Sequence, residues 1–469
     1  MKSAEQHDFR DETFAGRHVL VVGLGKSGMS SIKLLKKMGA RVSVSDSSEK
    51  GNIDQEALDR LRQEDVFVET GMHSKELFFS ADHVVVSPGV PLTASVLQEV
   101  RAKGTPIIGE MGLAARSMKT PMAAVTGTNG KSTVVTLLAG MFQSAGKKVF
   151  LGGNLGTPLT EYVLGPQDAD IAVVEVSSFQ LDTAGAFRPD VALLLNITPD
   201  HLDRYAGFDA YAESKMSIFA YQKPDDIAVL NGNDEEILGR LHAMPQNRRF
   251  FFSEALGNRL GADFTDTVVR VVLSEEERGR AEYYDLSESR LHEEPNVQNT
   301  MAAILAGRLM GCSQEDVQMA IRTFTPLGHR LTVVAEINGV TYLDDSKATN
   351  IGAVYSALKG MKQPVVLIAG GRDKGGEYGM LDDLVRQRVK AILLIGEARE
   401  RMSKAFHKLT KVERCDSLEE AVARAGSIAV EGDAVLLSPA CASFDMFAGY
   451  GHRGEIFSKA VMDLDGKGH

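Results

Sequence analysis

The residues best suited to phosphate chemistry lie in one segment, Ala124–Leu138, which reads AVTGTNGKSTVVTLL. Gly127 and Gly130 allow the backbone to turn tightly, so that its N–H groups can point at phosphate oxygens. Lys131 can reach the β- and γ-phosphates of a nucleotide, and the Ser132 hydroxyl can ligate Mg²⁺. The segment therefore predicts a nucleotide-triphosphate site.

The glycines of this loop are spaced differently from those of the common P-loop, which has a glycine where this chain has Val125. An apolar strand, AAVT, nevertheless enters the loop, and STVVTLLAGMF leaves it with helical character. A helix beginning here adds the partial positive charge of its N-terminus, and Thr133 offers a second hydroxyl to a metal ion. The alternative is a glycine-rich turn that binds nothing, but the order of strand, Gly-x-x-Gly-Lys-Ser and helix favours a nucleotide site.

A second glycine-rich loop follows the first apolar run of the chain. GLGKSG places Gly23, Gly25 and Gly28 after a strand, and Asp46 ends the next strand. This pattern is typical of a dinucleotide site and alone would indicate a nicotinamide-dependent dehydrogenase. The same geometry binds any diphosphate joined to a ribose, UDP-sugars included, and a loop without a ligand is the third possibility. A diphosphate-bearing substrate in the first site and ATP in the second would explain both loops.

These loops are positioned by apolar runs that alternate with helix-length segments along most of the chain. Continuous apolar strands separated by helices predict mainly parallel sheets covered on both faces. Polar and glycine residues gather at the carboxyl ends of the strands, where open α/β sheets bind ligands. The expected strands, in three blocks, are His18–Gly23, Arg41–Asp46, His83–Gly89 and Pro106–Gly109; Pro121–Gly127, Ile171–Val176, Val191–Asn196 and Ile227–Gly232; and Gly339–Asp345, Pro364–Gly371, Ala391–Glu397 and Ala434–Ala440.

The chain is therefore expected to be an α/β protein of three domains, which suits its 469 residues. We expect a Rossmann-like domain over residues 1–108 and a central P-loop-type ATPase domain with a mainly parallel sheet over 109–326. A second Rossmann-like domain is expected over 327–469. Phe251–His292 is charged and irregular, and is expected to form a small peripheral subregion.

Composition and charge narrow the possible partners. The 52 basic and 63 acidic residues give a formal net charge of −11, which argues against a general nucleic-acid binder and against binding to an anionic membrane surface. Cys312, Cys415 and Cys441 are far apart and show no Cys-x-x-Cys spacing, so neither a disulfide framework nor a zinc cluster is expected. A polar start, and no apolar run of about 18 residues, predict a cytoplasmic protein without membrane insertion.

Nearly the whole chain resembles the Mur ligases, ATP-dependent enzymes that build the peptide of bacterial peptidoglycan. TGTNGKST has the spelling of that family's ATP loop. Further motifs follow in the family's order: EVSSFQL (Glu175–Leu181), NITPDHLDRY (Asn196–Tyr205), YAESKMSIF (Tyr211–Phe219), NVQNTMAA (Asn296–Ala303), GHR (Gly328–Arg330), DDSKATN (Asp344–Asn350) and SPACASFDMFAGYGHRGEIF (Ser438–Phe457). SPGVP, GNLG, SSFQL, DDSKATN and GGRDKG favour the branch that adds D-glutamate, and the Asp-Asn-Pro-Arg motif of the diaminopimelate-adding branch does not occur in the sequence.

The resemblance implies an amide ligase that uses ATP to activate the carboxylate of UDP-N-acetylmuramoyl-L-alanine as an acyl phosphate. Lys131, Glu175, His201 and Lys215 would then be catalytic. Two Mg²⁺ ions are expected on Ser132, Glu175, His201 and Lys215, the lysine being carbamylated by CO₂ to give an anionic oxygen ligand. Without the motifs, Lys215 would be interpreted as a solvated helix lysine, Glu175 as a lysine-paired buried carboxylate, and His201 as a surface residue.

The resemblance also assigns binding residues for three small-molecule substrates. ATP is expected on Gly127, Thr128, Asn129, Gly130, Lys131, Ser132, Thr133, Asn296, Asn299, Arg330 and Asp345. The UDP-linked substrate is expected on Gly25, Lys26, Ser27, Gly28, Asp46, Ser47, Asn154 and His201. D-Glutamate is expected on Lys347, Thr349, Lys374, Ser438 and Phe444, for which ordinary surface-loop side chains are the alternative.

Three other functions remain open at this point. A nicotinamide-dependent dehydrogenase leaves the second and third domains without a role. A non-catalytic sensor of wall precursors has no need for the complete set of Lys131, Glu175, His201 and Lys215. Another Mur ligase with a different amino-acid acceptor is the alternative within the family. The chain is expected to act as a monomer, with the third domain swinging closed when the nucleotide binds.

Overall fold

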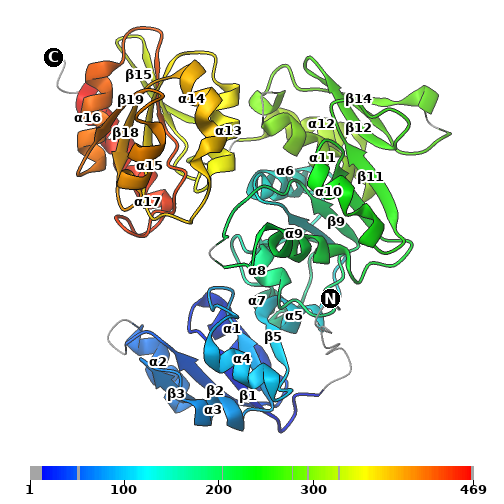
Figure 1. Cartoon of the computed structure of the whole chain (residues 1–469). Helices are drawn as coiled ribbons and strands as arrows, with labels where there is room; N and C mark the ends of the chain where they lie inside the picture. The colour runs from blue at the N-terminus through cyan, green and yellow to red at the C-terminus, as the bar shows by residue number, and fades with distance from the viewer. Residues whose placement is uncertain are drawn as a thin grey trace.

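The structure, a computed structural model, describes residues 13–49, 53–202, 204–276, 278–292, 295–325 and 328–465. Three sheets, each with its own helices, follow one another along the chain (Figure 1). We call the parts that carry them the first, central and third domains. The central domain, cyan to green in Figure 1, contacts both the blue first domain and the yellow-to-red third domain.

The first domain is built on a parallel sheet in the order β3-β2-β1-β4-β5. The central strands β1 and β4 are rich in valine and almost fully buried, as expected for a parallel sheet covered on both faces. Its elements are β1 (His18–Val22), α1 (Lys26–Lys37), β2 (Arg41–Asp46), α2 (Gln55–Gln63), β3 (Phe67–Thr70), α3 (Lys75–Ser80), β4 (His83–Val86), α4 (Ser95–Ala102) and β5 (Ile107–Gly109).

The central domain has a larger, mixed sheet in the order β14-β13-β12-β11-β10-β9-β6-β8-β7. The strands from β7 to β12 pair in parallel, and β13 and β14 add an antiparallel edge. Helices α11 and α12 pack on α6, which follows the predicted ATP loop. The elements are α5 (Glu110–Ala115), β6 (Met122–Thr126), α6 (Lys131–Ser144), β7 (Val149–Gly153), α7 (Leu159–Leu164), β8 (Ile171–Glu175), α8 (Ser178–Leu181), β9 (Val191–Leu194), α9 (Phe208–Met216), η3 (Ser217–Phe219), β10 (Ile227–Asn231), α10 (Glu235–Gly239), η4 (Leu241–Ala243), β11 (Arg248–Phe252), β12 (Gly261–Thr265), β13 (Val268–Val272), η5 (Arg278–Arg280), β14 (Glu282–Asp285), η6 (Arg290–His292), α11 (Asn296–Leu309) and α12 (Gln314–Thr323).

The expectation of an irregular peripheral subregion over Phe251–His292 is wrong. Strands β11 to β14 continue the central sheet through this segment, and they bury Phe252, Val269 and Tyr284 in the core beneath α11. The strands are short, and their outward faces carry charged side chains. Charged residues such as Asp263 and Arg270 interrupt the apolar residues of these short strands, so no long apolar run marks them in the sequence.

The third domain has a sheet in the order β15-β16-β20-β17-β18-β19, parallel except for the antiparallel pair β15 and β16. The predicted α/β class is thus confirmed for all three domains. The elements are β15 (Thr332–Ile337), β16 (Val340–Asp344), α13 (Ile351–Gly360), β17 (Val365–Gly370), η7 (Tyr378–Leu381), α14 (Asp382–Arg388), β18 (Val389–Ile395), α15 (Arg399–Phe406), β19 (Lys411–Arg414), α16 (Leu418–Ile428), β20 (Ala434–Leu437) and α17 (Tyr450–Asp465).

The two predicted domain boundaries fall at different kinds of position. The boundary after residue 108 lies within β5, so Gly109 still belongs to the first sheet. The boundary between residues 326 and 327 lies outside the described residues. Among the helices that the structure describes, none is long and apolar enough to cross a membrane.

We predict that the buried Arg453 is essential for the stability of the third domain. Its side chain, fully buried on α17, donates to Ser346 Oγ, Ser346 O and Cys441 O at 3.0, 2.8 and 3.2 Å. Arg453→Met should therefore leave buried acceptors unpaired and lower the free energy of unfolding by about 2–3 kcal/mol. Calorimetry would measure this as a lower melting temperature of the third domain.

Arg372→Met is the matched control. Arg372 is exposed and lies 3.9 Å from Glu397, so its loss should change stability by less than about 0.5 kcal/mol. Equal effects of the two substitutions would show that the buried hydrogen bonds of Arg453 do not stabilise the domain.

Candidate active site

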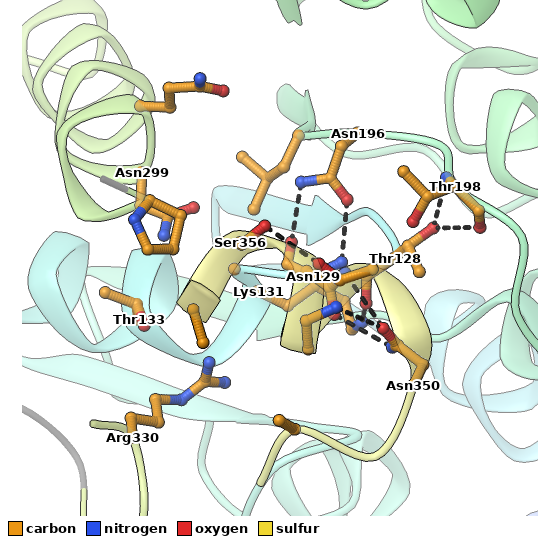
Figure 2. A pocket seen from close by; sticks show the side chains of 18 of the residues that line it. Thr128, Asn129, Lys131, Thr133, Asn196, Thr198, Asn299, Arg330, Asn350 and Ser356 are labelled. Carbon is orange, nitrogen blue, oxygen red and sulfur yellow. Dashed lines mark hydrogen bonds between the residues drawn. The ribbon is translucent and has the colours of Figure 1, made fainter. Parts of the chain in front are cut away.

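A cavity of about 740 Å³ lies between the central and third domains. The loop after β6, the ends of β8 and β9 and the start of α11 contribute to one wall, and the third domain, chiefly its residues up to α13 together with Met380 and Tyr450, forms the other (Figure 2). The cavity brings together side chains that are far apart in the sequence. The predicted site residues that line it are Thr128, Asn129, Gly130, Lys131, Ser132, Thr133, Asn154, Glu175, His201, Asn296, Asn299, Arg330, Asp345, Lys347 and Thr349.

The strand order explains why the loop and a carboxylate meet. Strand β6 lies between β8 and β9, with Val125 paired to Glu175 and Thr126 paired to Leu194. The loop that follows β6 therefore begins beside Glu175, at the carboxyl edge of parallel strands, where such sheets bind ligands.

The loop is held in shape from two sides. Gly130 has a φ of +87°, a conformation that glycine adopts without strain, and a Cβ at this position would lie 2.1 Å from Oδ1 of Asn299 on α11. On the other side, the backbone N–H of Asn129 donates to Oδ1 of Asn196, which follows β9, at 2.8 Å. The loop backbone thus lies close to Asn299 and Asn196 at the N-terminus of α6. The positive end of this helix favours an anion.

Two lysines converge on this loop. Nζ of Lys131 donates to the carbonyl oxygens of Gly127 and Thr128, both at 2.8 Å, and Nζ of Lys215 on α9 donates to Gly127 O at 2.8 Å. Lys215 is only 2% exposed, and burial, helped by the nearby charge of Lys131, holds its pKa well below the ordinary lysine value. A buried lysine in this state can react as a neutral amine.

Glu175 is a buried carboxylate with two close donors. Ser132 Oγ donates to its Oε2 and Asn154 Nδ2 to its Oε1, both at 2.7 Å. Burial alone would raise the pKa of Glu175, but the charge of Lys131 and these two hydrogen bonds hold the pKa below its ordinary value. An ionised carboxylate and a hydroxyl therefore lie side by side at the start of α6.

These oxygen donors fit a magnesium–nucleotide complex. Within the described residues, no group of three or more His, Cys, Asp or Glu side chains is placed to hold a metal ion. Mg²⁺ usually takes one or two protein ligands and completes its shell with phosphate oxygens and water. Ser132 and Glu175 match that requirement. His201 also faces the cavity, with Nε2 3.5 Å from Oδ2 of Asp200.

The third domain makes direct polar contacts with the central domain across the cavity. Nδ2 of Asn350 donates to Oδ1 of Asn129 at 3.0 Å and to Oδ2 of Asp200 at 3.1 Å. Figure 2 shows Asn350 meeting the loop in this way. Nζ of Lys374 lies 3.3 Å from Oδ1 of Asp200, which is 7% exposed in its side chain. Asp200 is therefore a shared acceptor for two third-domain side chains.

Lys347 adds a contact between the third domain and Ser132, whose hydroxyl is proposed to bind the metal ion. Its Nζ donates to Ser132 Oγ at 3.0 Å. Burial lowers the pKa of Lys347 to about 8, and the charge of Arg330 acts in the same direction. Arg330 points into the cavity from the third-domain side (Figure 2). Several cations thus crowd a partly buried space, which suits a polyanionic ligand.

Three residues predicted for D-glutamate are not among those that line the cavity: Lys374, which reaches Asp200, and also Ser438 and Phe444. Ser438 is fully buried and donates to Oδ2 of Asp345 at 2.8 Å, so it lies behind that cavity residue. Burial raises the pKa of Asp345 to about 7. Phe444 is 65% exposed and is not among the residues that line the cavity. Their roles toward D-glutamate remain predictions.

The residues predicted for the uridine diphosphate lie at the carboxyl end of the first sheet, outside this cavity. Asp46 accepts the N–H groups of Leu24 at 2.6 Å and Ser48 at 2.8 Å, and so fixes the start of the glycine loop. Lys26 and Ser47 are exposed beside it. Of the eight residues predicted for this ligand, Asn154 and His201 line the cavity.

Sequence reasoning did not select several polar residues that line the cavity. Asn196 and Asp200 belong to NITPDHLDRY, Asn350 ends DDSKATN, and Tyr450 lies in the last motif. The motifs therefore carried the signal. Which of their side chains point inward depends on the fold of each loop.

A phosphate-binding loop, a buried carboxylate and a facing cationic domain define a nucleotide-binding α/β protein with its phosphate site between domains. Three family models match the chain: the Mur ligase MurD-like N-terminal domain over residues 17–109, the Mur ligase middle domain over 125–307, and the Mur ligase glutamate ligase domain over 329–441. The chain belongs to the Mur ligase family.

Two relatives resemble the chain over almost its full length. A protein of Desulfosudis oleivorans, named UDP-N-acetylmuramoylalanine--D-glutamate ligase, is 44% identical over 448 residues, covering 96% of each chain. A protein of Syntrophotalea carbinolica with the same name is 40% identical over 456 residues, covering 97% of this chain and 99% of the relative.

Solved structures of other Mur ligases share the fold at low sequence identity. MurF from Acinetobacter baumannii has a TM-score of 0.60 at 15% identity and covers 97% of this chain and 93% of that one. The MurF ligase from Thermotoga maritima in complex with ADP has a TM-score of 0.58 at 17% identity, and 97% of each chain is covered. At these identities the likeness shows the three-domain fold alone.

We predict that a side chain at position 130 disrupts nucleotide binding. Gly130→Ala combines a left-handed backbone with a Cβ placed 2.1 Å from Asn299 Oδ1, so either the loop or α11 must shift. The affinity for ATP, measured by titration calorimetry, should fall by about tenfold or more.

Gly146→Ala separates the two causes. Gly146, beyond the other end of α6, also has a left-handed φ of +70°, but a Cβ there would meet no atom within 4 Å. This variant should lose about 1 kcal/mol of stability and keep its affinity for ATP. ATP binding by Gly130→Ala at the strength of the unaltered protein would contradict the assignment of the loop.

We also predict that affinity for the phosphate ligand depends on the charge of Lys347. Because the pKa of Lys347 is about 8, its side chain is positive below that pH and becomes neutral above it. Affinity for a non-hydrolysable ATP analogue should therefore weaken several-fold from about pH 7 to about pH 9. Lys347→Arg keeps its charge over this range and should flatten the dependence. Parallel pH profiles for the two proteins would exclude Lys347 as the titrating group.

Proposed function

We propose that this chain is an ATP-dependent ligase that joins D-glutamate to UDP-N-acetylmuramoyl-L-alanine in the synthesis of peptidoglycan precursors. The observation that carries the proposal is the cavity in which the phosphate-binding loop and Glu175 face Lys347 and Arg330 of the third domain. The acceptor is supported by the two relatives at 40% and 44% identity, which are named for this reaction.

The reaction requires two anions to meet, and the cationic side chains of the cavity suit this requirement. A carboxylate oxygen of UDP-N-acetylmuramoyl-L-alanine attacks the γ-phosphorus of ATP, the bond to ADP breaks, and an acyl phosphate forms. The amine of D-glutamate then attacks the carbonyl carbon. The carbon–oxygen bond to phosphate breaks, phosphate leaves, and the amine loses a proton as the amide forms. Cationic side chains fixed in place lower the repulsion between the anions.

Each wall of the cavity has a proposed role toward ATP. The loop from Gly127 to Thr133 would bind the phosphates, with Lys131 on the transferred group. Asn296, Asn299 and Asp345 would contact adenine and ribose, while Arg330 reaches the phosphates with a planar, permanently charged group. Mg²⁺ held at Ser132 and Glu175, with a second ion near His201, would supply further positive charge when bound.

The other two substrates would approach from opposite sides. The uridine diphosphate is proposed to lie on Gly25, Lys26, Ser27 and Gly28, with Asp46 and Ser47 near the uridine. Its muramoyl-alanine end would then extend toward Asn154 and His201. D-Glutamate has two carboxylates, which Lys347 and Lys374 could pair with, beside Thr349, Ser438 and Phe444. Lys374 contacts Asp200, so the binding of D-glutamate would replace one carboxylate partner of Lys374 with another.

We further propose that Lys215 is carbamylated. Its neutral amine would attack CO₂, form a nitrogen–carbon bond and release a proton, which converts a buried cation into an anionic oxygen donor. Burial and the lowered pKa of Lys215 support this step, because the neutral amine is the reactive form. We also propose that the enzyme acts in the cytoplasm, where ATP is available, and as a monomer, because one chain supplies both walls of the cavity.

Release of phosphate from Mg-ATP tests the proposed reaction. The protein would be supplied with bicarbonate and UDP-N-acetylmuramoyl-L-alanine, first without an acceptor and then with D-glutamate, L-glutamate, L-alanine, L-lysine or meso-diaminopimelate. We expect release that depends on D-glutamate, with the matching amide found by mass spectrometry. Release with another acceptor would keep the ligase and change the substrate. No release with any acceptor, from folded protein, would favour the sensor.

We predict that Lys215 carries the carbamate in solution. Protein equilibrated with ¹³C-bicarbonate should give a carbamate carbon signal by NMR, and Lys215→Arg should lose that signal, because its guanidinium does not become a neutral amine. Lys223→Arg is the control, since Lys223 is an exposed lysine of the same domain. An identical signal in the two variants would place the carbamate elsewhere, and no signal in the unaltered protein would exclude it.

A further inference from the structure

A chain of buried hydrogen bonds joins the first domain to the central domain. Ser30 Oγ on α1 lies 2.6 Å from Thr160 Oγ1 on α7. Thr160 donates from Oγ1 at 2.7 Å and from its backbone N–H at 2.6 Å to the same oxygen, Oε1 of Glu110 on α5. These three residues are 4%, 0% and 2% exposed. Helices α1, α5 and α7 pack together around them (Figure 1).

On the first-domain side, this chain ends at the glycine loop. Ser30 lies one turn into α1, whose first residue is Lys26. Its Oγ is 3.1 Å from the carbonyl oxygen of Ser27, within the loop proposed to bind the diphosphate. Movement of Ser30 relative to Thr160 would therefore move that loop relative to the central domain.

On the central-domain side, the chain leads to the metal-binding carboxylate. Thr160 lies in the first turn of α7, shortly after Asn154 in the chain. Asn154 donates to Oε1 of Glu175 at 2.7 Å, and its backbone N–H donates to Glu175 O at 2.8 Å. Thr160 is thus joined to the helix of the UDP-substrate loop by a hydrogen bond, and to the edge of the ATP site by the backbone that runs from Asn154 to α7.

Glu110 is an unusual residue for this position. Burial raises the pKa of Glu110, and in the described structure its Oε2 has no hydrogen-bond partner. A buried carboxyl group with an unpaired oxygen reduces stability. A leucine or methionine would avoid that cost but would leave the buried N–H and hydroxyl of Thr160 without their acceptor, so the Glu110 carboxyl group both pairs and orients Thr160.

We propose that Glu110 is a positioning residue for the UDP-linked substrate. It orients Thr160, which holds Ser30, and the three together fix the distance between the diphosphate loop and the ATP loop. The consequence for catalysis rests on the proposed function, because it assumes a ligand that spans from the first domain to the cavity. The joint between the domains stands on the geometry alone.

Removal of the Thr160 hydroxyl tests the joint. Thr160→Val keeps the shape of the side chain and breaks the bonds to Ser30 and Glu110, whereas Thr160→Ser retains the hydroxyl. The matched control is Thr120→Val, because Thr120 is a buried threonine whose hydroxyl bonds to Tyr162 on the same helix but does not reach the first domain. The loss of these two buried hydrogen bonds should raise the KM for UDP-N-acetylmuramoyl-L-alanine about fivefold to tenfold.

The effect should be confined to that substrate. The KM for ATP and kcat at saturation should change less than about twofold in Thr160→Val, and Thr160→Ser and Thr120→Val should resemble the unaltered protein. Glu110→Ala should reproduce the effect of Thr160→Val, and Glu110→Gln, which keeps an acceptor oxygen, should not. An unchanged KM in Thr160→Val and Glu110→Ala would overturn the positioning role.

A distance measurement tests the joint without any substrate. Spin labels on Glu56→Cys in the first domain and Asp225→Cys in the central domain, both at exposed positions, would report the spacing by pulsed electron resonance. The distance distribution should broaden in Thr160→Val and not in Thr120→Val. An unchanged distribution would overturn the joint itself. Broadening in a protein whose unaltered form does not turn over the UDP-linked substrate would retain the joint and reject the proposed function.

Discussion

The whole site depends on one buried carboxylate staying ionised beside the phosphate-binding loop. Glu175 can do so because the charge of Lys131 and hydrogen bonds from Ser132 and Asn154 offset the cost of its burial. The pairing of Val125 with Glu175 creates this arrangement. A register shift of one residue would turn Glu175 to the other face of the sheet, so the packing of the central sheet and the electrostatics of the site are linked.

The third domain adds positive charge to that of Lys131 in the central domain. Lys347 reaches Ser132, and both Lys374 and Asn350 reach Asp200, so side chains of the third domain contact polar and acidic groups of the central domain. The lowered pKa of Lys347 shows that its charge is held at a cost when no anion is present. A polyanionic ligand relieves that cost. Ligand binding should therefore favour the arrangement in which the two domains meet.

The sequence predicted the centre of each sheet better than its edges. Four of the missed strands, β3, β7, β15 and β19, lie at sheet edges, where one side of the strand lacks a neighbour and the side chains are half exposed. Their apolar runs are short. The missed strands β12 and β13 lie inside the central sheet, and there charged residues such as Asp263 and Arg270 interrupt the apolar runs.

Within the site, residues of a single loop were also easier to predict than contacts between separate loops. Gly130, Lys131 and Ser132 could be proposed from the sequence because the role predicted for them depends on local spacing within one loop, and the structure places all three at the cavity. Contacts such as Asn350 with Asn129, and the placement of Ser438 behind Asp345, depend on how loops fold and how domains meet. No local pattern encodes that geometry.

The most direct test of the account follows one oxygen atom. UDP-N-acetylmuramoyl-L-alanine labelled with ¹⁸O in its carboxylate would be turned over with Mg-ATP and D-glutamate, and the released phosphate analysed by mass spectrometry. If the carboxylate attacks the γ-phosphorus of ATP in this cavity, one ¹⁸O must leave with phosphate when the amide forms. Unlabelled phosphate, accompanied by the amide product, would contradict the acyl-phosphate route and the role assigned to the cavity.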